Sequence, residues 1–246
     1  MLRNVKLTIS YDGSGYHGWQ RQKESITTVQ QFLEDAIERA LGHSVKIRGS
    51  GRTDTGVHAV GQVANFFTDS PIPTEKMHRV ITRHLPADIR VIRSEDVSDD
   101  FDPIISSRSK LYRYTVFNNY EIPIQARPFC YQYYHTADAP TMQTAAAMLV
   151  GEHDFASFAP TGQKRQSTVR TLYRCEVWRK YHYIYFDLEG SGFLYHMVRN
   201  IVGTLLDIGR GHLLPDCIPD ILSAKDRDAA GPMAPANGLC LQWVKY

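Results

Sequence analysis

The stretch TTVQQFLEDAIERALG at residues 27–42 decides the first part of the fold. Its apolar residues recur at i, i+3, i+4, i+7, i+8, i+11 and i+12; they are Val29, Phe32, Leu33, Ala36, Ile37, Ala40 and Leu41. This spacing places them on one face of an α-helix. Thr27 or Thr28, with Gln30 or Gln31 three residues later, supplies a capping box, and Gly42 supplies the stop signal.

Strand patterns surround this helix. Residues 5–11 predict a strand that ends at the turn-rich sequence 12–15. Beyond the helix, the sequence predicts a pair of strands flanking a tight loop, a second helix closed by Pro86, and a fourth strand. These elements cover residues 44–50, 60–68, 74–85 and 88–92. The order β-α-β-β-α-β is that of the ferredoxin-like arrangement.

The second half of the chain repeats this logic with different lengths. It predicts a strand, a helix ended by Gly151, a hairpin, a second helix and a final strand. The second helix carries Leu194, Met197, Val198, Ile201, Leu205 and Ile208 on one face. The other elements cover residues 111–117, 141–149, 168–178, 181–189 and 239–245.

The boundary between the halves is predicted from charge. Residues 95–102 carry five acids and no base, which indicates a solvated connection. We therefore divide the chain near residue 103, into 1–103 and 104–246. Two similar halves also suit a length of 246 residues, since a typical domain has about 150.

Composition excludes several classes of protein. The four cysteines contain no CxxC pair, so a zinc ribbon or a thioredoxin-type redox site has no support, and we expect no metal. Arg3, Asn4 and Lys6 interrupt the N-terminal stretch, which lacks the apolar core of a signal peptide. No apolar run approaches the roughly 20 residues of a membrane span. The sequence predicts a cytoplasmic protein that does not enter a membrane.

The net charge of +2 hides a local concentration of bases. Residues 161–180 contain six bases against Glu176 alone, namely Lys164, Arg165, Arg170, Arg174, Arg179 and Lys180. Basic stretches interleaved with aromatic residues, here Tyr112, Tyr114, Tyr173 and Trp178, suit an RNA surface. A solvated strand pair with long basic side chains is the alternative, and charge alone does not decide between them.

The loop GSGRTDTGVH at 49–58 is the most informative for chemistry. Its three glycines permit close approach of a ligand to the backbone. Arg52 and Asp54 lie at i and i+2, so in an extended stretch they share a face and can pair or address one ligand. An ordinary turn in which Asp54 caps local amides is the alternative. The loop matches no phosphate-binding glycine pattern.

These residues also carry a family resemblance. GRTDTGVHA at 51–59 closely resembles the GRTDAGVHA signature around the catalytic aspartate of the TruA family of tRNA pseudouridine synthases. One departure is Thr55, where the family usually has alanine. Five further stretches resemble family motifs in the same order: YDGSGYHGWQRQ at 11–22, KLYRYTVF at 110–117, GEHDFASF at 151–158, GFLYHMVRNIVGTLLDIGRG at 192–211 and ANGLCLQWV at 236–244.

The resemblance implies an isomerase without a cofactor. It would convert uridine to pseudouridine at positions 38, 39 and 40 of the tRNA anticodon arm, and it would act as a homodimer. Asp54 matches the catalytic aspartate, the nucleophile or base. Arg199 matches the arginine that pairs with it, and Tyr112 matches the tyrosine that stacks on the target uracil and is a candidate acceptor of its C5 proton. The implied fold is mixed α/β (α+β), with two ferredoxin-like halves joined through a mixed, mainly antiparallel central sheet.

Other residues gain expected roles from the same resemblance. Arg52 matches a side chain that enters the helical stack and holds the target nucleotide out, and Leu239 matches an apolar residue lining the pocket. Lys164, Arg165 and Arg170 are candidates for the tRNA surface. His58 is expected to be structural, because no Cys or Glu set lies near it.

Two other functions compete with this reading. A non-catalytic RNA-binding protein or tRNA chaperone on the same fold would be favoured by loss of the aspartate, tyrosine or arginine, and all three are present. A carboxylate-based hydrolase would need a second acid or a metal cluster near Asp54, and the sequence places none there. The sequence does not determine which of the three uridines is modified, or which atom Asp54 attacks.

Overall fold

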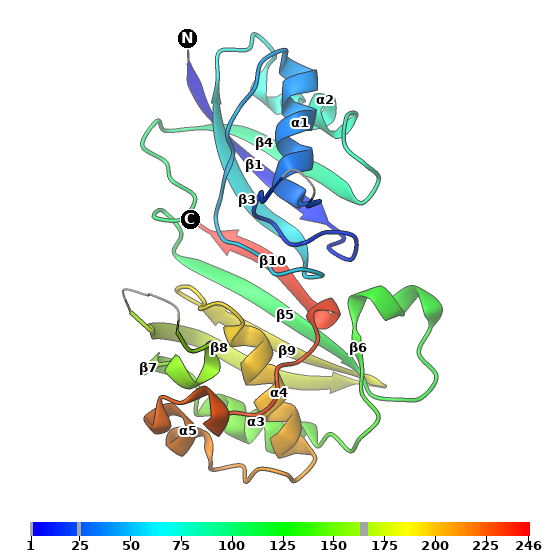
Figure 1. Ribbon diagram of the computed structural model, residues 1–246, viewed down its shortest axis with the longest axis vertical. Coiled ribbons are helices and arrows are strands. Elements are labelled where there is room, and N and C mark those ends of the chain that lie inside the picture. Colours follow the sequence, from blue (N-terminus) through cyan, green and yellow to red (C-terminus); the bar gives the residue numbers. More distant parts are fainter. Residues whose placement is uncertain (1, 24–25, 163–166) are drawn as a thin grey trace. The chain divides into compact units, whose positions relative to one another are not determined.

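A computed structural model describes residues 2–23, 26–162 and 167–246 (Figure 1). The chain divides into two compact units, which are described separately. One unit comprises Met1–Arg108 and Leu241–Tyr246, and the other comprises Ser109–Cys240. The sequence placed the boundary at 103 and assigned the whole final strand to the second half. In the structure the last six residues belong with the first unit.

The first unit is an antiparallel sheet with two helices over it (Figure 1). Strand β1 pairs antiparallel with both β3 and β4, and β2 pairs antiparallel with β3. The resulting order β4-β1-β3-β2 is the ferredoxin-like order that the sequence predicted. Part of β10 adjoins β3 as well. The elements are β1 (Arg3–Tyr11), α1 (Val29–Leu41), β2 (Arg48–Gly49), β3 (His58–Thr68), α2 (Thr74–Thr82), β4 (Ile89–Val97) and β10 (Leu239–Lys245).

The core of the first unit lies between this sheet and its helices. Val5, Leu7 and Ile9 alternate along β1 and are fully buried, as are Leu33 and Ile37 of α1. Both ends of α1 are where the sequence placed them. The side chain of Thr28 accepts a hydrogen bond from the Gln31 amide, and Gly42 has the left-handed φ of 81° that ends the helix.

Two buried side chains of α1, Gln30 and Glu34, are absent from the predicted apolar stripe. Glu34 is buried and its two carboxylate oxygens are occupied. Oε2 accepts from Arg21 Nη1 at 2.7 Å, whereas Oε1 accepts from the Ile47 amide at 3.2 Å and from Gln30 Nε2 at 3.0 Å. Glu34 therefore ties α1 to the chain before β2, a role that helical periodicity does not reveal.

The acidic segment 95–102 is only partly a connection. Glu95 and Asp96 lie on β4, which runs to Val97 instead of ending at residue 92. Glu95 pairs with Lys6 at 2.6 Å and with Arg93 at 2.7 Å. The prediction of a connecting segment is wrong for these two acids, because both belong to a strand of the sheet. The bases that pair with Glu95 lie on β1 and earlier on β4, outside the segment.

Two other predicted lengths are also wrong. The strand expected over 44–50 is reduced to Arg48–Gly49, and the helix expected over 74–85 ends at Thr82. The chain before β2 is instead held by the Glu34 carboxylate. This carboxylate accepts the hydrogen bond of the Ile47 amide, which in a strand would go to a neighbouring strand.

The C-terminus is anchored inside the first unit. The Arg108 amide donates to the Lys245 carbonyl at 2.8 Å, and the Tyr246 hydroxyl donates to the Pro103 carbonyl at 3.0 Å. The Lys6 ammonium lies over the Tyr246 ring, 5.3 Å from its centroid. Burial raises the pKa of Tyr246 above its ordinary value. These contacts explain why the final residues fold with the N-terminal part of the chain.

The second unit has the strand order β5-β9-β8-β7, with antiparallel pairing throughout. Strand β6 pairs with β5 in parallel, so the sheet is mixed but mainly antiparallel. The predicted mixed α/β class is confirmed. The elements are β5 (Ser109–Phe117), β6 (Tyr131–Gln132), α3 (Ala139–Ala147), β7 (Gly151–Asp154), β8 (Val169–Lys180), β9 (Tyr183–Gly190), α4 (Met197–Gly209) and α5 (Ile218–Ala224), with short 3₁₀ turns at Ile124–Phe129, Ala156–Phe158, Arg227–Ala229 and Ala236–Gly238.

Helix α4 is buried on nearly all sides, although the sequence predicted one apolar face. Twelve of its 13 residues are buried. A Cβ at Gly203 would lie 1.6 Å from the Pro232 carbonyl oxygen, so the chain after α5 runs directly against the helix. On Gly209, a Cβ would lie 2.8 Å from Met142 Sδ of α3. Gly209 thus lets α3 approach the axis of α4, and Gly203 lets the chain at 232–234 approach it. This chain, here called the covering segment, covers a second side of α4 and explains why the helix is buried on more than one face.

Candidate functional site

The loop between β2 and β3 carries Arg52 and Asp54. Its entry is fixed by two residues that hydrogen-bond across the strands. The Ser50 amide donates to the Val63 carbonyl at 2.7 Å, and the Ser50 hydroxyl lies 2.7 Å from Gln62 Oε1. Gln62 Nε2 in turn donates to the Gly51 carbonyl at 3.0 Å. Because Ser50 and Gln62 are buried, these bonds are shielded from water.

Residues 11–19 hold the middle of this loop. The Trp19 amide donates to the Thr53 carbonyl at 3.1 Å, and the Gly56 amide donates to the Tyr16 carbonyl at 3.3 Å. The hydroxyls of Tyr11 and Thr53 lie 2.8 Å apart in a buried hydrogen bond. The N-terminal motif therefore fixes the backbone on each side of Asp54. In the sequence this motif was noted only because it resembles a family motif, and no role was assigned to it.

Two glycines of that motif are required by the contact. Gly18 has a φ of +84°, and a Cβ there would lie 2.4 Å from the Thr53 carbonyl oxygen. A Cβ on Gly13 would lie 2.0 Å from the Val57 carbonyl oxygen. Real Cβ atoms do not approach backbone oxygens so closely, so any larger residue would push the loop away.

His58 has a structural place, as the sequence predicted. Its ring is buried, and Nδ1 accepts a hydrogen bond from the Gly13 amide at 3.0 Å. The same nitrogen lies 3.2 Å from Asp12 Oδ1. The neighbouring Tyr16 donates to Asp88 Oδ1 at 2.7 Å, and burial together with this bond raises the pKa of Tyr16 above its ordinary value. These bonds join the start of β3 and the start of β4 to the motif at 11–19.

Arg52 and Asp54 differ in their surroundings. Arg52 is exposed, Thr53 is buried, and Asp54 is half-buried. The stretch 52–54 has no regular secondary structure, and the middle residue is the buried one of the three. The Asp54 carbonyl accepts from the Val57 amide at 3.1 Å and closes a turn. The carboxylate thus sits at a turn whose backbone is tied on both sides.

In the second unit, Tyr112 lies on β5. It is buried, with 8% of its surface exposed, and pairs with Leu188 across the sheet. The Phe193 ring meets it edge to face, with 5.2 Å between the ring centroids and an interplanar angle of 82°. Phe193 belongs to the loop before α4, so this contact connects β5 to the start of that helix.

Arg199 lies in the first turn of α4 and is 9% exposed. Its Nε donates to the Ala234 carbonyl at 2.8 Å, while the Ala234 amide donates to the Arg199 carbonyl at 3.1 Å. The helix arginine is therefore held to the covering segment by both its side chain and its backbone. A buried guanidinium needs such partners, because an unsatisfied charge costs several kcal/mol in a low-dielectric site.

Tyr114 contacts the same segment as Arg199, and the sequence assigned it no role in the site. Its hydroxyl donates to the Pro235 carbonyl at 2.7 Å, one residue after the Arg199 partner. Burial raises its pKa well above the ordinary value, and the positive charge of Arg199 opposes that shift. Gly238 lies against the Tyr114 ring, where a Cβ would come within 2.5 Å. Leu239, buried at the start of β10, directly follows this contact.

Lys110 begins the motif KLYRYTVF, and the sequence assigned it no role of its own. Lys110, Tyr112 and Tyr114 lie at i, i+2 and i+4 on β5 and share one face of the strand. Burial lowers the pKa of Lys110 from its ordinary 10.5 to about 8. Strand alternation in KLYRY was the signal that could have grouped it with Tyr112.

The predicted basic surface is partly described by the structure. Lys164 and Arg165 lie outside the described residues. Arg170 is the second residue of β8 and donates from Nη1 to the Val169 carbonyl at 2.6 Å. Among the interleaved aromatics, Tyr173 and Trp178 are exposed. Tyr112 and Tyr114, the other two aromatics of that group, are buried.

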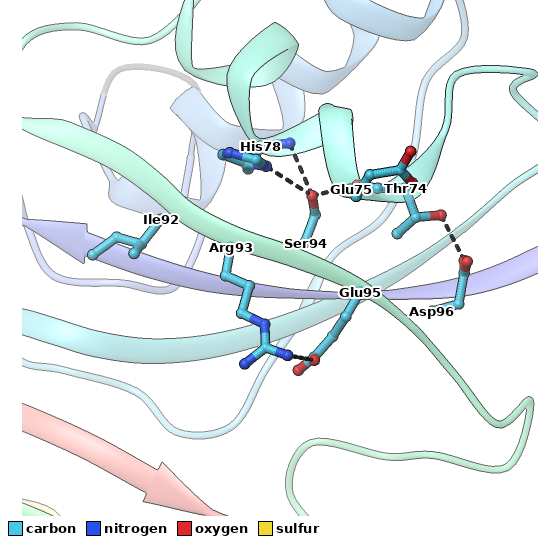
Figure 2. A pocket seen from close by; sticks show the side chains of 8 residues that line it. All are labelled: Thr74, Glu75, His78, Ile92, Arg93, Ser94, Glu95 and Asp96. Carbon is cyan, nitrogen blue, oxygen red and sulfur yellow. Dashed lines mark hydrogen bonds and ion pairs between the residues drawn. The ribbon is translucent and has the colours of Figure 1, made fainter.

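A pocket of about 390 Å³ lies between α2 and β4 in the first unit, and Figure 2 shows the side chains that line it. None of the predicted site residues lines it. Its Ser94 hydroxyl donates to the Thr74 carbonyl at 2.5 Å and accepts from the His78 amide at 2.9 Å, while the Thr74 hydroxyl donates to Asp96. These polar groups bond one another and hold α2 on the sheet.

The described part of the chain holds neither a candidate metal site nor a candidate membrane span. Within it, His, Cys, Asp and Glu side chains form no group of three or more that could hold a metal ion. In the same residues, no helix is both long enough and apolar enough to cross a membrane.

The model of the tRNA pseudouridine synthase family matches residues 7–104 and 145–246. The chain belongs to this family. It is also 42% identical over its full length to the whole tRNA pseudouridine synthase A of Thermoanaerobacter sp. strain X514. The enzymes of the same name from Clostridium acetobutylicum and Moorella thermoacetica are 41% and 43% identical, over 100% and 98% of this chain and 100% and 99% of theirs.

Family membership confirms the predicted class of enzyme, an isomerase that converts uridine to pseudouridine in tRNA. Among solved structures, a chain of the archaeal box H/ACA sRNP Nop10–Cbf5 complex aligns with 92% of this chain at 13% identity. The alignment covers 60% of that chain with a TM-score of 0.36, and the family assignment does not depend on it.

The contact between Gly18 and Thr53 gives a first prediction. Gly18→Ala places a Cβ against the Thr53 carbonyl oxygen and strains a positive φ, so the loop must move. A displacement of about 1 Å at a reacting group costs about 100-fold in rate. We expect a loss of pseudouridine formation of that order, measured with tRNA under single-turnover conditions. Gly15→Ala is the matched control, because a Cβ there has no neighbour within 4 Å. Equal activity of the two variants would contradict the supporting role of residues 11–19.

The lowered pKa of Lys110 gives a second prediction. The folded pKa of about 8 lies below the ordinary 10.5, so between these values the unfolded chain binds more protons than the folded one. The free energy of unfolding should therefore gain a contribution that rises with pH, by about 1 kcal/mol per pH unit, and is fully present above pH 10.5. Denaturant unfolding from pH 8 to 10 measures it. Lys110→Met should lack this contribution, and an identical pH slope in both proteins would contradict it.

Proposed function

We propose that this chain isomerises uridines 38, 39 and 40 in the anticodon arm of tRNA, with Asp54 as the group that attacks or deprotonates the nucleotide. The observation that supports Asp54 is the framework around it. Two backbone hydrogen bonds hold the residues around it: the Trp19 amide donates to the Thr53 carbonyl, and the Gly56 amide donates to the Tyr16 carbonyl. A carboxylate fixed in advance can act without the cost of reorganising the site during the reaction.

The proposed chemistry needs no bound cofactor. The N-glycosidic bond of uridine breaks, the uracil rotates while held in the site, and C5 forms a new bond to the ribose carbon. Asp54 either forms a transient covalent bond and then leaves, or takes a proton; a carboxylate is suited to both. The C5 proton must finally be removed, and we assign Tyr112 as the residue that stacks on the uracil and is positioned to accept this proton.

Arg199 is proposed to supply the positive charge that keeps Asp54 ionised. A guanidinium remains charged at every relevant pH and forms strong hydrogen bonds to carboxylates. The role is supported by the rigid placement of Arg199, which is bonded to Ala234 through its side chain and its backbone. Leu239 is proposed to line the uracil pocket with an apolar surface.

Arg52 is proposed to occupy the place of the extruded nucleotide. Taking a base out of a helical stack costs a few kcal/mol, which a side chain entering the gap offsets. Its exposure suits this role, since the side chain must reach into the RNA and not into the protein. Lys164, Arg165 and Arg170 are proposed to bind phosphates of the same tRNA.

The decisive experiment replaces the carboxylate. Asp54→Asn should abolish pseudouridine formation, measured by tritium release from C5-labelled tRNA, because an amide can neither attack nor accept a proton. The affinity for tRNA should change little. Thr55→Ala is the control: its side chain is exposed and the change restores the usual family residue, so activity should persist. Turnover by Asp54→Asn would refute the mechanism, whereas wild-type binding without any turnover would favour a tRNA-binding protein without catalysis.

Phosphate binding by the basic stretch gives another prediction. Arg170→Ala should reduce the slope of log affinity against log salt by about one, because one fewer counterion is released on binding. The dissociation constant for tRNA, measured by fluorescence anisotropy from low to high salt, tests this. Arg83→Ala, an exposed base at the end of α2, is the control and should leave the slope unchanged. Identical slopes for wild type and Arg170→Ala would remove Arg170 from the tRNA surface.

We also propose that the chain works as a homodimer in the cytoplasm, where its tRNA substrate is found. Exposed large apolar side chains between β5 and α3 support the dimer; they are Tyr120, Ile124, Phe129 and Tyr134. Light scattering should give twice the mass of one chain. Ile124→Asp should weaken the dimer, whereas Ile105→Asp, equally exposed in the first unit, should not. A monomeric wild-type protein would contradict the proposal.

A further inference from the structure

The loop before α4 carries an aromatic pair that the proposed mechanism does not use. The rings of Tyr195 and His196 stack with 3.6 Å between their centroids and an interplanar angle of 28°. Tyr195 is 48% exposed, although its neighbours Leu194 and Met197 are buried. The chain therefore turns one large aromatic side chain outward from an otherwise buried segment.

The backbone at this point is held in an unfavourable conformation. His196 has a φ of 64° in the left-handed region, which costs a residue with a Cβ about 1–2 kcal/mol. In the described part of the chain only Tyr181 and Lys225 share this property; they sit in the β8–β9 turn and at the end of α5. His196 instead occupies the N-cap of α4, where Ser, Thr, Asp or Asn is preferred, and its side chain makes no capping hydrogen bond.

The pair lies close in sequence to residues connected with the proposed site. Phe193, two positions before Tyr195, packs edge to face on Tyr112. Arg199 follows His196 by three positions, in the first turn of α4. Side chains in a helix lean toward its N-terminus, so Arg199 extends toward the end where the pair lies.

We propose that Tyr195, supported from behind by His196, is a stacking platform for a nucleobase next to the target uridine. An exposed aromatic ring already stacked on one side offers its other face to a base, and such a contact contributes about 1–3 kcal/mol per base. A base held in this way would offset part of the cost of opening the stack around the extruded uridine. The left-handed backbone at His196 accompanies the stacked placement of the two rings. This inference rests on the proposed function and adds a binding contact to it.

The test measures stacking directly, in a background that does not react. An anticodon stem-loop RNA with 2-aminopurine beside the target uridine is titrated with the Asp54→Asn protein, and stacking on Tyr195 should quench the fluorescence. Adding Tyr195→Ala should abolish the quench at one of the two flanking positions and weaken binding by about 5- to 100-fold. Tyr195→Phe keeps the ring and should retain both. Tyr181→Ala removes another exposed tyrosine, in the β8–β9 turn, and is the control.

Each outcome decides the proposal. Retention of the full quench and affinity by Tyr195→Ala at both flanking positions would overturn it. So would a lowered unfolding temperature with unchanged quenching, since that result assigns the ring a purely structural role. His196→Gly relieves the backbone strain while removing the supporting ring, so it should stabilise the protein and still weaken the quench. Tritium release by the wild type checks the proposed function separately, so that its failure is not mistaken for failure of the platform.

Discussion

The contact between the loop at 50–57 and the segment at 11–19 is the constraint on which the first unit depends. Two backbone hydrogen bonds join the segments, one from Trp19 to Thr53 and one from Gly56 to Tyr16. The loop on its own has no secondary structure to hold it. Its position is set by a strand end and a turn that come some 40 residues earlier in the chain, and the approach is possible only because Gly13 and Gly18 lack a Cβ. The motif at 11–22 is thus explained as a support for Asp54.

The second unit uses the same physical device with other residues. Helix α4 is buried from both sides, and the segment that covers it passes directly over Gly203. That close passage brings the Ala234 and Pro235 carbonyls to Arg199 and Tyr114. A buried guanidinium and a buried phenol are each satisfied by neighbouring carbonyls of one short stretch. In both units, glycines allow irregular chain to lie close enough to regular elements to fix a polar side chain.

Much of the fold followed from the sequence because its signals are local. On α1, the Thr28 cap and the Gly42 stop act within one helix and are confirmed, and Val29, Leu33, Ala36 and Ile37 of the predicted stripe are buried. Predictions failed where the partner lies elsewhere in the chain. Glu95 was assigned to a solvated linker because its partner Lys6 is on another strand, and Glu34 was overlooked because burial of a carboxylate depends on Arg21 and the Ile47 amide. Tyr112 and Tyr114 were grouped with exposed aromatics because a sequence does not say which face of a strand is covered.

By itself, then, the sequence determined the class of fold, the enzyme family and the residues that carry the family's motifs, since each is recorded in the order and type of neighbouring residues. Only the tertiary structure decided how those residues are held. It showed that Gly18 must be glycine because of Thr53, that Lys110 is half-buried on the same strand face as Tyr112, and that Tyr195 is turned outward on a strained His196. Distances and burial between segments far apart in the chain arise from packing, and packing is not encoded in any one stretch.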